Sequence, residues 1–138
     1  MDWKLELVTL PVTDVDRAKE FYIERLGFRL DVDHDVSDDF RIVQLTPPGS
    51  SCSITFGVGV GAGTGAVRSL RLVVSDIEAA YEELQARGLE SGGIVHFVRG
   101  DPEPKPGPDP ERGDFMSYVF FDDPDGNGWG VQEAGHRS

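Results

Sequence analysis

The sequence predicts an α+β fold built from two β-α-β-β-β modules, and three observations lead to this prediction. The chain repeats one pattern of apolar strand, capped helix and glycine stop, three strand-like runs follow each helix, and a glycine-rich segment separates the two copies. We therefore expect a single domain over residues 1–138, with module one at about 4–57, a flexible linker at 57–65 and module two at about 66–133.

Each module opens with an apolar strand that leads into a helix cap. The strand LELVTLPV comes before Thr13, and the strand SLRLVV ends directly before Ser75. Thr13 with Asp16, and Ser75 with Glu78, have the spacing of a capping box, in which the hydroxyl accepts a hydrogen bond from the first helical turn. Two helices are therefore expected at equivalent places in the repeat.

The residues after each cap have the periodicity of an amphipathic helix. Each helix is predicted to end at a glycine, Gly27 or Gly88, in the left-handed conformation that closes a helix. Apolar side chains recur at helical spacing and predict the buried faces: Val15, Ala18, Phe21, Tyr22 and Leu26 in the first helix, and Ile77, Ala80, Tyr81 and Leu84 in the second.

Strand-like runs complete each module. They are FRLDVDHDV, FRIVQLT and CSITFGV in the first half, and SGGIVHFVR, FMSYVFF and GWGVQE in the second. An insertion at Arg99–Asp114 carries five prolines, which exclude a central strand or a helix. It is predicted to be an extended loop, either a plain surface loop or a lid.

Composition excludes several function classes. The net charge of −12, with no cluster of lysine or arginine, disfavours nucleic acid and anionic membranes as partners. No stretch approaches the roughly 20 apolar residues of a membrane span, and the N-terminus lacks the pattern of a signal peptide. Cys52 is the single cysteine, so we expect no internal disulfide and a cytoplasmic protein.

Three segments carry a family resemblance. VTDVDRAKEFYIERLGF, VVSDIEAAYEELQARG and DPDGNGW, in this order and spacing, resemble the vicinal oxygen chelate superfamily of glyoxalase I, the bleomycin-resistance proteins and the extradiol dioxygenases. The resemblance extends over roughly Leu5 to Glu133. It implies that the modules curl a mixed sheet around a cavity with the helices outside, and that the protein is a homodimer.

The resemblance also implies where a metal would bind. Three of the family's ligand positions fall at Leu7, Ser69 and Gly130, and the fourth falls within residues 53–56, which contain no carboxylate or imidazole. A divalent transition metal needs several histidine or carboxylate ligands. We therefore expect no metal and no cofactor, and we expect the DPDGN turn to be retained because it shapes the last hairpin.

The alternation of side chains along the strands predicts that the other potential ligands do not converge on a metal site. Glu6 and Glu133 should point away from the cavity, His34 lies near a strand end, and His136 lies in the C-terminal tail. His96 lies within an apolar strand. It is either a hydrogen-bonded structural side chain or a weak candidate for a general base.

The same alternation selects residues that could line the cavity. The candidates for ligand binding are Thr9, Ser69, Arg71, His96 and Gln132. An inward-pointing Arg71 needs a partner, which is either an internal acid or the carboxylate or phosphate of a ligand. Tyr118 and the pair Phe120-Phe121 could form an apolar wall or belong to the core, whereas Trp129 should alternate away from the cavity.

Two function classes remain open. The first is a metal-free protein that binds a small organic molecule in the cavity, as the antibiotic-sequestering members of the family do. The second is an enzyme, either a lyase or isomerase that uses His96 as base and Arg71 as oxyanion partner, or a dioxygenase, acting on a small carbonyl or aromatic substrate.

Overall fold

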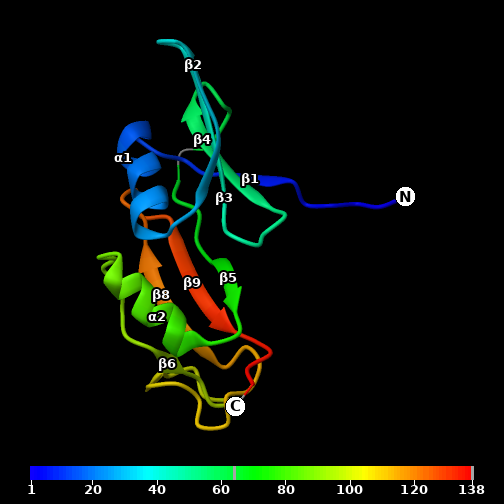
Figure 1. Ribbon diagram of the computed structural model, residues 1–138, viewed down its shortest axis with the longest axis vertical. Helices are drawn as coiled ribbons and strands as arrows, with labels where there is room; N and C mark the ends of the chain where they lie inside the picture. Colours follow the sequence, from blue (N-terminus) through cyan, green and yellow to red (C-terminus); the bar gives the residue numbers. More distant parts are fainter. Residues whose placement is uncertain (64, 138) are drawn as a thin grey trace. The chain divides into compact units, whose positions relative to one another are not determined.

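The computed structural model describes residues 1–63 and 65–137 and confirms the α+β class (Figure 1). The chain forms two compact units. The first contains Met1–Val67 together with Asp123–Asn127, and the second contains Arg68–Asp122 together with the residues from Gly128 onward. None of the helices in the described part of the chain has the length and apolar character needed to span a membrane.

The first unit packs a helix against a four-stranded sheet. Its elements are β1 (Leu7–Thr9), α1 (Val15–Glu20), the π-helical turn η1 (Phe21–Arg25), β2 (Arg29–Ser37), β3 (Phe40–Thr46) and β4 (Ser53–Val58). The strand order is β1-β4-β3-β2, with β1 parallel to β4 and the other pairs antiparallel. Tyr22 is fully buried, and its ring centroid lies 5.9 Å from that of Phe56 on β4.

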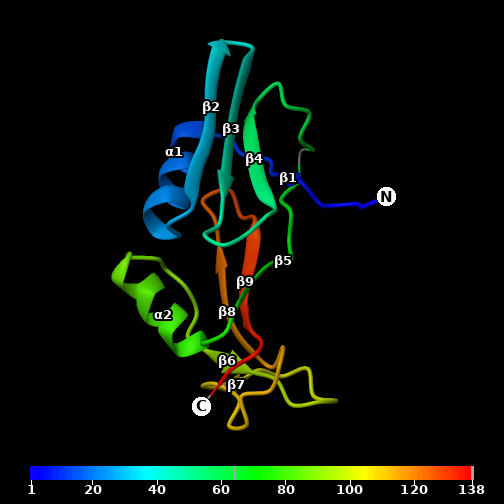
Figure 2. The same ribbon diagram turned by 45° about the vertical axis from the view of Figure 1, so that its right-hand side comes forward.

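The second unit repeats this topology. Its elements are β5 (Leu70–Val74), α2 (Ile77–Ala86), β6 (Val95–His96), β7 (Lys105–Pro106), β8 (Ser117–Asp122) and β9 (Gly128–Glu133) (Figure 2). The order is β5-β9-β8-β6-β7, and β5 is parallel to β9 just as β1 is parallel to β4. The two β-α-β-β-β patterns expected from the sequence are therefore confirmed, with β7 as a short addition at one edge.

The helix caps differ from the expected capping boxes. Asp14 and Asp76 are the N-caps, so each helix starts one residue later than predicted. Asp14 accepts a hydrogen bond from the Arg17 amide at 3.0 Å, and Asp76 accepts from two amides at 3.1 and 3.2 Å. A carboxylate at this position also interacts favourably with the helix dipole. Thr13 is engaged elsewhere, because its hydroxyl donates to Asp125 at 2.7 Å.

The glycine stops are confirmed. Gly27 and Gly88 have φ values of 70° and 78°, in the left-handed region expected of a residue that closes a helix. The amide of Gly27 donates to the carbonyl of Ile23 at 3.1 Å, and that of Gly88 donates to the carbonyl of Gln85 at 3.0 Å.

Two segments outside the core strands differ from the expectations drawn from the sequence. β4 ends at Val58, as the run CSITFGV predicts, so the linker starts after Val58 and not at Gly57; a Cβ at Gly57 would lie 1.8 Å from the Arg41 carbonyl oxygen, so only glycine fits there. Residue 64 of the expected linker lies outside the described residues. The strand expected over SGGIVHFVR is reduced to β6, since its two glycines offer no side chain to pack.

The turn Asp123–Asn127 is held within the first unit. The Asp123 carboxylate accepts hydrogen bonds from the Tyr22 hydroxyl at 2.6 Å and from the Asn127 side chain at 2.8 Å. Asn127 also donates to the Pro11 carbonyl at 3.0 Å and accepts from the Val67 amide at 2.8 Å. All of these hydrogen bonds join groups of the first unit to one another and fix the shape of the turn, which agrees with the expectation that the turn is retained for its shape.

Candidate functional site

One face of the second sheet combines aromatic rings with a cation. The strand register aligns Arg71 with Gly130 and Phe120, and it aligns Val73 with Gln132 and Tyr118. Residues directly opposite one another on neighbouring strands point to the same side of a sheet. We call this surface the aromatic face, and it consists of Arg71, Val73, Phe97, Tyr118, Phe120, Gly130 and Gln132.

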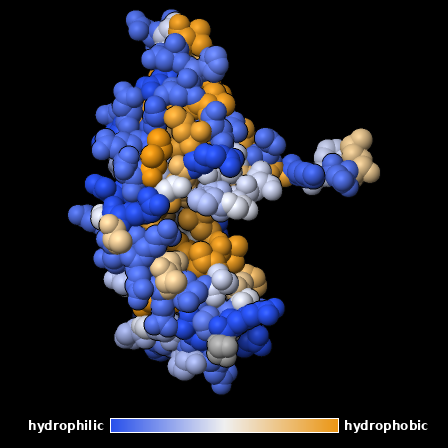
Figure 3. Space-filling view, viewed as in Figure 1, coloured by the Kyte–Doolittle hydropathy of each residue, from blue (hydrophilic) through white to orange (hydrophobic). Residues whose placement is uncertain are grey.

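The aromatic face is accessible. Val73 and Phe120 are 61% and 38% exposed, whereas Val119 and Val131, which alternate with the face residues, are 0% and 2% exposed. Apolar side chains are seen at the surface over β5 and β9 (Figure 3). A contiguous patch of apolar side chains at the surface of a protein often marks a binding region.

The rings on this face form an ordered cluster. Tyr118 and Phe120 stack with centroids 5.4 Å apart and planes 5° apart. Phe97 packs edge-on against both, with centroids 5.6 Å from Tyr118 and 6.4 Å from Phe120. Such a cluster offers a flat apolar surface with fixed ring orientations, which suits a planar ligand.

Arg71 is held against these rings. Its Cζ lies 5.9 Å from the Tyr118 centroid and 5.5 Å from the Phe120 centroid, within the range of cation–π attraction. Its Nη1 donates to the Leu70 carbonyl at 3.2 Å. No carboxylate of the described residues pairs with it. The guanidinium therefore keeps donors available for a ligand.

The residues at the family's metal positions do not fit a metal. Gly130 offers no ligand atom, and a Cβ added there would lie 3.0 Å from both Arg71 Nη1 and Phe120 Cε1, so these side chains would have to shift to admit a larger residue. The neighbouring guanidinium would also repel a divalent cation. Ser69, with φ 70°, lies just outside β5, and Leu7 is an aliphatic residue of β1. No chemical step can be assigned to a metal at these positions.

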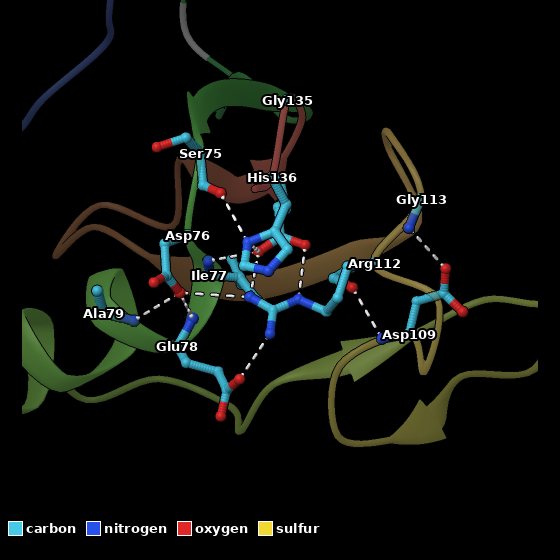
Figure 4. A network of polar contacts seen from close by, with 12 residues as sticks. Ser75, Asp76, Ile77, Glu78, Ala79, Asp109, Arg112, Gly113, Gly135 and His136 are labelled. Atoms are coloured by element: carbon cyan, nitrogen blue, oxygen red, sulfur yellow. Dashed lines mark hydrogen bonds and ion pairs between the residues drawn. The ribbon is translucent and has the colours of Figure 1, made fainter. Parts of the chain in front are cut away.

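A second polar cluster in this unit centres on Arg112 (Figure 4). Its guanidinium donates to both carboxylate oxygens of Glu133, at 2.9 and 2.5 Å, and also reaches Glu78 at 2.6 Å and Asp76 at 3.3 Å. Glu133 is fully buried and accepts a further hydrogen bond from the Ile77 amide at 2.8 Å. Hydrogen bonds from Arg112 hold the pKa of Glu133 below its usual value, so the carboxylate stays charged.

The same cluster contains three groups with metal-ligand chemistry. One ligand atom each from Asp76, Glu133 and His136 lies within 4.8 Å of the others. Arg112 Nη2, however, already contacts the carboxylates of both Asp76 and Glu133 and supplies the compensating positive charge. His136 Nδ1 lies 3.2 Å from the Ser75 carbonyl oxygen, so this residue is packed against the unit although it lies close to the C-terminus. The arrangement is an ion-pair network around an arginine.

The structure brings together only some of the predicted site residues. Arg71 and Gln132 share the aromatic face, and Ser69 lies beside it with an irregular backbone. His96 pairs with Ser117, so it lies on the opposite face of the sheet from Arg71, and its Nδ1 is 2.9 Å from the Gly107 carbonyl oxygen. Thr9 belongs to the first unit, on β1 opposite Thr55.

Sequence reasoning missed part of this surface. The sequence alone does not identify Phe97 as part of this surface, and it leaves Tyr118 and Phe120 open as either cavity-wall or core residues. The period-two spacing of Tyr118 and Phe120 already places the two rings on one side of a strand. The signal that identifies this side is their register with Gln132 and Gly130 on β9, which the sequence does not give.

Comparisons with known proteins agree with the fold. TnmS3, an antibiotic binding protein from Streptomyces sp. CB03234, is 28% identical, with a TM-score of 0.67 and coverage of 96% of both chains. A glyoxalase/bleomycin resistance protein/dioxygenase superfamily member from Sphaerobacter thermophilus DSM 20745 is 25% identical, with a TM-score of 0.69 over 96% of this chain and 98% of the other.

A curated relative and a family model extend the comparison. The uncharacterized protein YetH of Bacillus subtilis (strain 168) is 24% identical over 122 residues, which cover 87% of this chain and 89% of that protein. The family model described as Glyoxalase/Bleomycin resistance protein/Dioxygenase superfamily matches residues 4–131. The chain therefore belongs to the glyoxalase/bleomycin resistance protein/dioxygenase superfamily.

Proposed function

We propose that the protein binds a planar aromatic small molecule carrying a carboxylate or phosphate group, and that it does so on the aromatic face without a metal. The observation that carries this proposal is the position of Arg71. Its guanidinium lies over the rings of Tyr118 and Phe120, and no carboxylate of the described residues neutralises it.

The face supplies three complementary interactions. The stacked rings of Tyr118 and Phe120 offer apolar contact to a planar ligand. The planar fork of Arg71 can donate two parallel hydrogen bonds to a carboxylate or phosphate. Gln132, opposite both Tyr118 and Val73, adds a neutral donor and acceptor. The net charge of −12 repels an anionic ligand, so the affinity for such a ligand depends on the positive charge of Arg71.

The comparisons support binding of a small molecule. TnmS3 is described as an antibiotic binding protein, and its similarity covers 96% of this chain. The aromatic face of this chain offers stacked rings and one arginine, which would recognise a planar compound with an ionised group. Antibiotic sequestration is accordingly the biological role that we assign to the proposed binding.

Three further properties belong to the proposal. We propose that binding needs neither metal nor cofactor, since Leu7, Ser69 and Gly130 supply no ligands. We propose a homodimer, in line with the family and with the open edges that β2 and β5 present in their sheets. Light scattering should then report a mass near twice 15.1 kDa, whereas a monomer mass would contradict the dimer. We propose a cytoplasmic location, which suits a chain with one free cysteine.

The enzymatic alternative has no comparable support. It requires His96 as base and Arg71 as oxyanion partner at one reacting centre. The register of β6 with β8 places these two side chains on opposite faces of the sheet, and His96 is engaged with the Gly107 carbonyl.

Calorimetric titration with three matched compounds tests the proposal. The compounds are 2-naphthoate, its neutral amide 2-naphthamide, and cyclohexanecarboxylate, which keeps the charge but lacks the planar ring. We expect 2-naphthoate to bind at least about fivefold more tightly than either analogue, since a charge-assisted hydrogen bond and ring stacking each contribute about 1 kcal/mol or more.

Two variants locate the effect. Arg71→Gln should remove the preference for 2-naphthoate over its amide, whereas Arg68→Gln, an equal change of charge at an exposed arginine outside the aromatic face, should leave it in place. Equal affinity of the wild-type protein for all three compounds would contradict the proposal. An equal loss of preference in both variants would contradict the role of Arg71.

A further inference from the structure

A continuous chain of contacts links the Arg112 cluster to the aromatic face. Arg112 binds the Glu133 carboxylate through two hydrogen bonds. The backbone carbonyl of Glu133 accepts from the Phe115 amide at 2.7 Å, and the carbonyl of Phe115 accepts from the Tyr118 hydroxyl at 2.7 Å. The last of these bonds holds the tip of a ring on which the proposed ligand would stack.

Glu133, near the start of this series of contacts, is held firmly in place. Glu133 is fully buried, and its carboxylate accepts from Arg112 and from the Ile77 amide at the start of α2. A buried carboxylate with this many donors has a single favourable position. Its backbone lies next to Gln132, which belongs to the aromatic face. The ion pair therefore fixes one end of β9 close to the proposed binding surface.

The backbone is strained at two residues in the middle of this series of contacts. Arg112 and Phe115 have φ values of 51° and 63°, in the left-handed region that residues with a Cβ rarely adopt. Such conformations persist only where surrounding contacts impose them. Here those contacts include the Arg112 ion pairs and the bond from the Phe115 amide to Glu133, together with the bonds that the amides of Arg112 and Gly113 donate to Asp109. Without the ion pair, the segment would relax and the Phe115 carbonyl would move.

Tyr118, the last residue in this series of contacts, determines the geometry of the binding surface. Tyr118 stacks on Phe120 with planes 5° apart, packs against Phe97, and has Arg71 above its ring. A tyrosine ring that loses the hydrogen bond of its hydroxyl is freer to change its tilt. Its stacking on Phe120 and its contact with Arg71 would then change together.

We propose that Arg112 is a positioning residue for the aromatic face, acting through Glu133 and Phe115 to orient the ring of Tyr118. The side chain of Arg112 itself is bound to Asp76, Glu78 and Glu133, all outside this face. The inference rests on the proposed ligand binding for its functional consequence, but the orientation of Tyr118 can be measured without a ligand.

A double-mutant cycle with 2-naphthoate tests the proposal. The proteins are the wild type, Arg112→Met, Tyr118→Phe and the double variant. Each single change removes the same hydrogen-bonded support of the ring, so each should weaken binding about two- to tenfold, the range for one lost hydrogen bond. The double variant should bind no more weakly than the weaker single variant. Arg99→Met, at an exposed arginine of the same insertion, should bind like the wild type.

A ligand-free measurement separates this inference from the proposed function. In protein with ¹³C-labelled tyrosine, the Tyr118 Cζ shift reports its hydroxyl bond, and the Arg71 side-chain proton shifts report the ring below the guanidinium. Arg112→Met should move both sets of shifts, and so should Arg112→Met/Glu133→Gln, in which no unpaired buried charge remains to threaten folding.

The outcomes are distinguishable. If 2-naphthoate does not bind the wild type while the shifts move as expected, the positioning role stands and the proposed ligand class is wrong. If a folded Arg112→Met/Glu133→Gln protein keeps the wild-type shifts, the positioning role is wrong. Multiplicative losses of affinity in the double variant would also overturn it, because they would show that Arg112 and Tyr118 act independently.

Discussion

Replacing Asn127 by alanine should destabilise the protein strongly, although Asn127 lies in a turn. Its side chain is fully buried and makes three hydrogen bonds: to the Pro11 carbonyl at 3.0 Å, to the Asp123 carboxylate at 2.8 Å, and from the Val67 amide at 2.8 Å. Alanine would leave all three partners without this contact.

The magnitude follows from these partners. A buried polar group left unpaired costs about 1–3 kcal/mol, and the half-buried Pro11 and Val67 can recover part of this from water. We expect a loss of about 2–4 kcal/mol of unfolding free energy. With an unfolding entropy of about 2.1 cal/mol/K per residue, this corresponds to a fall in Tm of roughly 7–14 °C.

Urea and thermal unfolding followed by circular dichroism provide the assay. Asp122→Asn, an exposed change in the same hairpin, serves as the control and should remain within about 0.5 kcal/mol of the wild type. If Asn127→Ala also remained within that range, the turn would not be held by these bonds. The explanation that the DPDGN turn is retained for its shape, although Gly130 offers no metal ligand, would then be wrong.

Two further predictions concern Gly130 and Asp33. Gly130→Ala should weaken binding of 2-naphthoate about two- to fivefold, since the new Cβ would lie 3.0 Å from both Arg71 Nη1 and Phe120 Cε1 and make these side chains shift by a few tenths of an ångström; unchanged affinity in titration would refute this packing. Hydrogen bonds from Arg41, and then from Lys19, lower the pKa of Asp33 from 3.8 to about 2. Because the folded pKa is the lower one, its stabilisation is present above about pH 3.8 and is lost as the pH falls toward 2. Asp33→Asn should flatten the stability curve in that window, and an unaltered curve in urea unfolding would contradict the assignment.

Much of the fold could be predicted from the sequence because its signals are local. The glycine stops at Gly27 and Gly88 and the apolar helix faces lie within short windows, and the repeat makes each half a check on the other. The helix starts were displaced by one residue because Thr13 and Asp14 are both good N-caps. The choice is settled by Asp125, which binds the Thr13 hydroxyl from 112 residues away.

The candidate site was harder to predict because it depends on register. Alternation along single strands correctly placed Arg71 with Gly130 and Gln132, whose strands are regular. It wrongly grouped His96 with Arg71, since β6 is only two residues long and its pairing with β8, which spans the proline-rich insertion, puts His96 on the other face. Arg112 had no local signal at all, because its carboxylate partners lie 21 to 36 residues away in the sequence.

The most direct test is an NMR titration of the EDTA-treated protein, labelled with ¹³C at its aromatic residues and arginines, with 2-naphthoate. The account predicts saturable shifts at Phe97, Tyr118, Phe120 and the Arg71 side chain, while Phe121 and Trp129, buried on the opposite face, stay unmoved. Shifts that appear only after a divalent metal is restored, or that centre on residues outside the aromatic face, would contradict it.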